Sequence, residues 1–221
     1  MRLINYPFKN VNFNRGTSVF IDACFLLTLL DDKSRKFTEC TKISRILYNN
    51  SCQLYISPLI SAETVNRLII ALFVKDIRLF TIGSNKTLNN KKHLNSILQY
   101  FSKDDKNLLA KESEVYLDKI NFKKYFDKIY KSGNSKLLKV YFQKAVELEK
   151  ILENRLHIKY VSINKQTVIN ARDYIAKNLM GVNDAFHLAI TVQNNIDYLL
   201  TLDKDFKRLK LNNNKVTLLK I

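Results

Sequence analysis

The chain has 221 residues, 46% of them hydrophobic, and a formal net charge of +17 at pH 7. Apolar residues occur along its whole length, so we exclude a disordered chain and expect a globular core of ordinary size. No apolar run is long enough to span a bilayer, and residues 1–7 lack the apolar stretch of a secretion signal, so we expect no membrane partner and a cytoplasmic location.

The net charge and the cysteines limit the classes of partner and ligand. A charge of +17 favours an anionic partner such as nucleic acid. An AT-rich genome would also encode many lysines, so charge alone leaves both explanations open. The three cysteines, Cys24, Cys40 and Cys52, form no C-x-x-C pair, which fits reduced structural thiols better than disulfides or a zinc site.

The first part of the chain alternates short apolar runs with helical patterns. Residues 1–16 are polar and irregular and predict a surface lead-in. Residues 18–22 form an apolar run that ends on Asp22, which predicts a buried strand. Two helical patterns and a second strand follow, at residues 24–30, 37–48 and 53–57. A strand, a helix and another strand in this order are typical of a parallel α/β unit.

The helix after the second strand carries a candidate acid. Its apolar side chains recur with a period of 3.6 residues; they are Val65, Leu68, Ile69, Leu72 and Phe73. Glu63 is expected in the first turn on the opposite face, with Arg67 one turn later. Taken alone, Glu63 either points to the carboxyl edge of the sheet or merely complements the helix dipole.

From about residue 84 to residue 156 the pattern is helical and highly charged. Long helical patterns cover residues 93–100, 103–129 and 136–156, with a turn at 132–134. Lysines alternate here with aromatic residues, which include Tyr125, Phe126, Tyr130, Tyr141 and Phe142. Such a mixture can grip phosphates and stack on unpaired bases, or it can form a solvated helical hairpin with an aromatic seam. We expect an all-helical insertion, about 84–156, within a single domain that covers residues 1–221.

The last part of the chain returns to alternating strands and helices. Its predicted elements are a strand at 157–162, a helix at 165–178, a helix that opens at Asn183, a strand through Leu199 and Leu200, a turn at 206–210 and an edge strand at 215–220. We therefore expect an α/β fold in which a central, mainly parallel sheet is flanked by helices.

Four acids are expected at one edge of that sheet. Asp22 and Asp203 end strands, while Glu63 and Asp184 lie near the starts of helices, and the carboxyl ends of parallel strands share one edge. Carboxylates so close together raise one another's pKa unless a cation lies between them. Mg²⁺ and Mn²⁺ prefer such oxygen ligands, and a site of this kind suits phosphodiester hydrolysis.

Four sequence blocks together resemble the PIN-domain ribonucleases, which include toxins of bacterial type II toxin–antitoxin pairs. The blocks are residues 19–27 with Asp22, residues 55–58 leading to Glu63, residues 183–189 with Asp184, and residues 197–206 with Asp203. The last block is the most specific. The resemblance covers residues 17–82 and 157–221 and does not extend over the helical middle.

The resemblance implies a three-layer fold and assigns roles to individual residues. Asp22, Glu63, Asp184 and Asp203 match the acidic quartet that binds the metal and activates water. Thr201 matches a hydroxyl residue beside the last acid, and Cys24 stands where many members have Asn or Ser.

Three further residues near these blocks have two readings each. Asp205 is either an outer acid or a surface residue, and Arg67 is either a phosphate contact or a structural arginine. His187 follows Asp184 by about one helical turn, and we expect it to orient a neighbour rather than to act as a general base.

We therefore expect a Mg²⁺- or Mn²⁺-dependent endoribonuclease that is the toxin of a toxin–antitoxin pair. The expected partners are an RNA substrate, an antitoxin protein and a second copy of the chain in a homodimer. One alternative is an RNA-processing nuclease without an antitoxin. The other is a non-catalytic PIN-like scaffold that binds RNA or protein.

Overall fold

A computed structural model describes residues 2–9, 11–111, 113–203 and 216–221. These residues include a six-stranded sheet in the order β1-β6-β5-β2-β3-β4, and every neighbouring pair of strands is parallel. The strands are β1 (Arg2–Asn5), β2 (Ser18–Ile21), β3 (Gln53–Ile56), β4 (Lys159–Tyr160), β5 (Tyr198–Thr201) and β6 (Thr217–Lys220).

The inner strands of the sheet are covered on both faces. In β2 and β5 the residues Phe20, Ile21, Leu199 and Leu200 are fully buried, although neighbouring side chains of a strand point to opposite faces. Continuous apolar runs of this kind are typical of parallel sheets whose two faces are both covered. The prediction of buried strands at these positions is confirmed.

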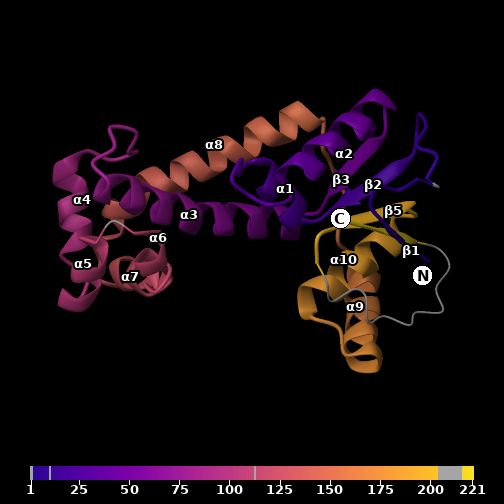
Figure 1. Ribbon diagram of the computed structural model, residues 1–221. Coiled ribbons are helices and arrows are strands. Elements are labelled where there is room, and N and C mark those ends of the chain that lie inside the picture. The colour runs from indigo at the N-terminus through magenta and orange to yellow at the C-terminus, as the bar shows by residue number, and fades with distance from the viewer. Residues whose placement is uncertain (1, 10, 112, 204–215) are drawn as a thin grey trace. The chain divides into compact units, whose positions relative to one another are not determined.

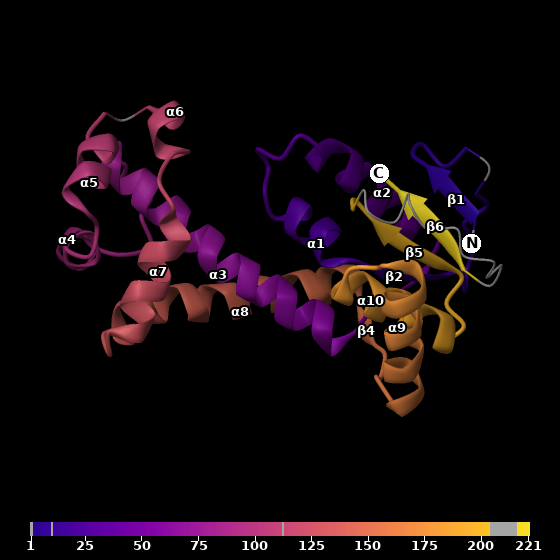
Figure 2. The same cartoon turned by 90° about the horizontal axis from the view of Figure 1, so that it is seen from below.

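Helices lie on both faces of the sheet and complete three layers. In Figure 1, α1 (Ala23–Leu29) and α2 (Phe37–Asn49) lie on one face, while α9 (Lys165–Asn178) and α10 (Val182–Gln193) lie on the other. The view in Figure 2 shows the same separation. The predicted α/β class with a parallel sheet between helices is therefore confirmed, and the sheet is wholly rather than mainly parallel.

The chain divides into two compact units. One consists of residues 1–64 and 149–221 and holds the sheet, and the other consists of residues 65–148 and is helical. The long helices α3 (Pro58–Thr81) and α8 (Lys139–Leu156) contribute residues to both units. The helical unit also contains α4 (Lys91–Leu98), α5 (Lys103–Leu109), α6 (Glu114–Leu117), α7 (Phe122–Lys131) and the 3-10 helix η1 (Ser135–Leu138).

Each unit has buried apolar residues of its own. The large core cluster around Phe20, Ile56 and Leu199 contains only residues of the sheet unit. In the helical unit, Phe73 is fully buried and meets the rings of Phe126 and Tyr141 edge-on, with centroids 5.5 Å apart in both pairs. Among the helices that the structure describes, none is long and apolar enough to cross a membrane.

Two predictions about the ends of the sheet are wrong. The lead-in at residues 1–16 contains β1, an edge strand that is mostly exposed and therefore lacks an apolar pattern. The last strand, β6, is not at an edge, because β1 pairs with it on one side and β5 on the other. Its buried residues Leu218 and Leu219 fit this inner position.

Several predicted helix and strand boundaries also differ. Within the single helix expected at 103–129, the described helical residues belong to α5, α6 and α7, and α7 starts anew where Asn121 caps it by accepting a hydrogen bond from the Lys124 amide. The strand expected at 157–162 is reduced to Lys159–Tyr160. The turn predicted at 206–210 lies outside the described residues.

Two boundaries concern the candidate acids. Gly181 rather than Asn183 is the N-cap of α10, although Asp184 does lie in the first turn, as predicted. Helix α3 begins at Pro58, which puts Glu63 in the second turn rather than the first.

Candidate active site

The ends of β2 and β5 place two of the predicted acids beside one threonine. The two strands are adjacent, with Ile21 opposite Leu200, and the Asp22 amide donates to the Leu200 carbonyl over 3.1 Å. The Thr201 hydroxyl donates to Oδ2 of Asp22 over 2.8 Å and accepts from the Asp203 amide over 2.9 Å. Thr201 thus fixes the Asp22 carboxylate and the backbone that carries Asp203.

Helix α10 brings a buried histidine to the same place. His187 is 2% exposed, and its Nε2 lies 3.8 Å from Oδ1 of Asp22 and 3.8 Å from Oε2 of Glu63. Its Nδ1 is buried and has no hydrogen-bond partner among the described residues. The structure therefore brings together Asp22, which follows β2, Glu63 of α3 and His187 of α10.

The contact between α3 and α10 also includes Asn183. Its side-chain amide donates to Oε2 of Glu63 over 3.2 Å, so it orients this carboxylate instead of capping its own helix. Sequence reasoning missed this role. Asn183 and His187 are four residues apart and lie on one face of α10, which is the pattern that could have indicated a shared target.

Asp184 lies in the first turn of α10 and is partly buried. A Cβ atom added to Gly181 would lie only 3.1 Å from Oδ2 of Asp184, so the carboxylate folds back over the start of its own helix. The φ of Gly181 is −56°, a value that any residue adopts. The glycine therefore leaves room for the Asp184 carboxylate rather than permitting an unusual backbone.

Burial gives Asp22 unusual electrostatics. Asp22 is 5% exposed, and this burial raises the pKa of its carboxyl group. His187 and the Thr201 hydroxyl lower that pKa, while the nearby Glu63 raises it. A cation beside this carboxylate would offset the cost of its burial.

The chemistry of these side chains fits a divalent cation. Carboxylate oxygens are the preferred ligands of Mg²⁺ and Mn²⁺, and a cation would favour the ionised form of Asp22. The described residues contain no group of three His, Cys, Asp or Glu side chains already arranged to hold a metal ion. Asp22 and Glu63 meet at His187, Asp203 is connected to Asp22 through Thr201, and Asp184 is on the first turn of the helix that carries His187.

The sequence indicates two further candidate residues, Asp205 and Arg67. Asp205 lies outside the described residues. Arg67 is exposed on α3, four residues after Glu63, and belongs to the helical unit.

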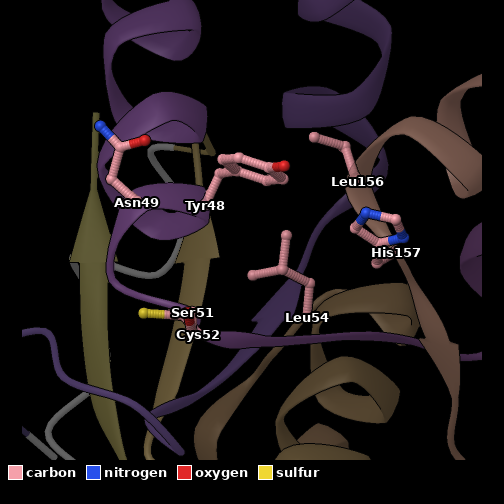
Figure 3. A pocket seen from close by; sticks show the side chains of 7 residues that line it. All are labelled: Tyr48, Asn49, Ser51, Cys52, Leu54, Leu156 and His157. Atoms are coloured by element: carbon pink, nitrogen blue, oxygen red, sulfur yellow. The ribbon is translucent and has the colours of Figure 1, made fainter.

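A separate cavity lies beside the amino end of β3. It has a volume of about 570 Å³ and is lined by residues of α2, β3 and α8 and of the segments that follow α2 and α8, among them Tyr48, Cys52, Leu54 and His157. Figure 3 shows the ring of Tyr48 directed toward Leu156 and His157, above Leu54. Cys52 immediately precedes β3, whereas the acids follow the carboxyl ends of β2 and β5, so this cavity is not part of the candidate site.

Comparison with known families shows a similarity to one described family. The model of the family described as PIN domain matches residues 101–211, which is half of the chain. The matched range contains Asp184 and Asp203 as well as part of the helical unit, and it begins after Asp22 and Glu63. No curated protein matches the chain.

Proposed function

Because this chain belongs to the PIN domain family, whose members are typically nucleases, we propose that it is a metal-dependent endoribonuclease that hydrolyses RNA phosphodiester bonds. The observation that supports this proposal best is the buried carboxylate of Asp22, which Thr201 holds beside Asp203 and which shares His187 with Glu63.

Each side chain of the site has a proposed task. Asp22, Glu63, Asp184 and Asp203 would hold Mg²⁺ or Mn²⁺. When bound, the ion supplies Lewis acidity toward the phosphate and lowers the pKa of the attacking water. Thr201 holds Asp22 in place, and Asn183 orients Glu63. The buried His187 keeps the carboxylates of Asp22 and Glu63 apart and oriented. Outside this group, Arg67 contacts a phosphate of the RNA and Asp205 acts as an outer acid.

The biological role that we propose is that of a toxin. The support for it is the four sequence blocks around the acids, which resemble PIN-domain toxins. In this role the chain forms a homodimer, is neutralised by an antitoxin and acts in the cytoplasm, and residues 84–156 are an insertion in a single PIN-like domain. A related nuclease that processes RNA without an antitoxin would use the same site.

One observation favours a non-catalytic scaffold as the second candidate. Within the described parts of the chain, the acids are not gathered into a ready-made group of three metal ligands. A scaffold of this type would bind RNA or protein without cutting it.

The test is cleavage of a mixed RNA pool by the purified chain, with Mg²⁺, with Mn²⁺ and with EDTA. We expect metal-dependent cleavage that falls about 100-fold or more in Asp22→Asn and in Asp203→Asn, because each substitution removes a charged ligand. The matched control is Asp173→Asn, an exposed acid of α9 whose partner is Lys177, and it should cut like the wild type.

Three results bear on the rival explanations. Cleavage that persists in both site variants would show that another site or a contaminant cuts the RNA. Binding of RNA without cleavage by either metal would support the scaffold. Growth arrest on expression, relieved by Asp22→Asn, would support the toxin role, whereas growth unaffected by a chain that cuts RNA would favour the processing nuclease.

A further inference from the structure

The helical unit carries more positive charge than its share of the chain. Residues 65–148 contain 17 Lys and Arg residues and eight Asp and Glu residues, which is a net formal charge of +9 out of +17. The excess is concentrated between residues 119 and 144, where eight lysines accompany a single acid, Asp127. Seven of these lysines are exposed; they are Lys119, Lys123, Lys124, Lys128, Lys131, Lys136 and Lys139.

Two aromatic side chains lie exposed among these lysines. Tyr130 of α7 is 55% exposed and Phe142 of α8 is 37% exposed. Their rings are nearly parallel, with an interplanar angle of 21° and centroids 6.2 Å apart. Exposed aromatic rings that lie together in this way offer flat faces to a planar ligand.

A buried aromatic residue, Phe126, packs against both Tyr130 and Phe142. The ring of Phe126 is 6.5 Å from that of Tyr130 and 6.1 Å from that of Phe142, and it is nearly parallel to both. Phe126 in turn meets Phe73 edge-on inside the helical unit. The exposed rings are therefore attached to a packed core rather than to a loop, which reduces the entropy that they would lose on binding.

Lysines flank both rings on their own helices. Lys123 precedes Tyr130 by seven residues, or two turns of α7, and Lys139 precedes Phe142 by three residues on α8. Lys131 follows Tyr130 directly. Lys123 is paired with Asp127 over 2.6 Å, but both side chains are exposed, and such a pair is weak enough to exchange for a phosphate.

We propose that Lys123, Tyr130, Lys131, Lys139 and Phe142 form an aromatic–lysine surface that binds single-stranded RNA. Unpaired bases stack on Tyr130 and Phe142, and the lysines bind the neighbouring phosphates. The proposal deepens the proposed nuclease function and rests on it for the choice of RNA as the natural ligand.

The character of the surface favours a single strand over other anionic partners. In duplex RNA the faces of the bases are covered by their neighbours, and recognition uses the backbone and the 2′-hydroxyls. A surface of lysines without exposed aromatic rings would therefore be sufficient to bind duplex RNA. An acidic protein would be expected to use the exposed aliphatic Val146, one turn after Phe142, as readily as the aromatic pair.

The test is fluorescence anisotropy of a short, unstructured, labelled RNA titrated with the full chain. The titration uses the Asp22→Asn background in EDTA, so that binding is read without cleavage. We expect Tyr130→Leu and Phe142→Leu to weaken RNA affinity about fivefold or more each, because leucine keeps the apolar contact with Phe126 but has no face for stacking. Tyr130→Phe should bind like the parent, and circular dichroism melts verify that each variant is folded.

The matched control for the rings is Val146→Ser. Val146 lies on the same helix as Phe142 and is equally exposed, at 39%, but it has no aromatic face, so its loss should leave RNA affinity unchanged. An equal loss of RNA affinity in Val146→Ser and Phe142→Leu would refute stacking of bases on the rings. Unchanged affinity in both leucine variants would overturn the whole proposal and would leave the surface to a protein partner.

The lysines are tested through salt dependence. Lys123→Gln combined with Lys139→Gln should reduce the slope of log affinity against log salt by about 1.4, because each phosphate contact on a single strand contributes about 0.7. The control is Lys177→Gln, which also breaks an exposed pair between a lysine and an aspartate four residues away on one helix, but in the sheet unit. A fall of about 0.7 for Lys177→Gln, half that of the double variant, would mean that charge acts diffusely and that no such surface exists. Absence of cleavage by the wild type would refute the nuclease but would leave this binding result intact.

Discussion

At the scale of single residues, Thr201 is the link between the two strands that carry acids. Its hydroxyl is fully buried, donates to Asp22 and accepts from the Asp203 amide. Valine has nearly the same shape but can do neither. Thr201→Val should therefore lower the free energy of unfolding by about 1–3 kcal/mol, since buried polar partners are left without hydrogen bonds, and it should also reduce cleavage.

Urea denaturation measures the first effect, and Thr201→Ser is the informative comparison. Serine restores the hydroxyl and should recover most of the cleavage activity while it leaves a small cavity. If Thr201→Val cuts RNA as well as the wild type does, the hydrogen bond to Asp22 is not needed for the site.

At the scale of elements, α8, α3 and β4 meet at a buried acid that is independent of the candidate site. Glu149 of α8 is 8% exposed and accepts hydrogen bonds from Ser61 of α3 over 2.5 Å and from Tyr160 of β4 over 3.4 Å. Burial raises the pKa of Glu149; the Ser61 hydroxyl lowers it and the neighbouring Glu153 raises it.

The sign of this shift predicts a pH dependence. Because the pKa is higher in the folded chain than in the unfolded chain, the neutral carboxyl group stabilises the fold below about pH 4.5, and this contribution is lost as the pH rises through the folded pKa. Glu149→Gln should remove this part of the fall in the free energy of unfolding with rising pH. The measurement is the difference in the free energy of unfolding between wild type and variant across this range, and a difference that does not vary with pH would contradict the prediction.

The elements also show what the sequence could predict. Strands β2 and β5 are recognisable because burial on both faces requires continuous apolar runs, and their ends necessarily bring Asp22 and Asp203 to one edge. Strand β1 is not recognisable, because an exposed edge strand imposes no apolar pattern. The contact between Asn183 and Glu63 depends on the approach of α10 to α3, which no local pattern encodes.

At the scale of the whole molecule, the two units have separate apolar interiors. Phe73 is fully buried in the helical unit, and the core cluster of the sheet unit contains no residue between 65 and 148. Phe73→Ala should cost about 3–5 kcal/mol, because it leaves a cavity between Phe126 and Tyr141. This loss of stability should be confined to the helical unit.

Native-state hydrogen exchange read by mass spectrometry measures where that cost falls. Amides within residues 65–148 should lose protection in Phe73→Ala, while those of β2 and β5 keep theirs. The reciprocal variant is Ile43→Ala, which removes a buried side chain of α2 and should act on the sheet unit. Equal loss of protection in both units from either substitution would show that they unfold together.

The order of the strands has a consequence for the time at which the candidate site can form. Strand β2 cannot complete its pairing until β5 exists, and β1 pairs with β6 at the other end of the chain. A nascent chain leaving the ribosome therefore presents Asp22 and Glu63 long before Asp184 and Asp203 are made. The candidate site can therefore form only after translation has passed Asp203, so that a shorter nascent chain cannot yet cut RNA in the way proposed.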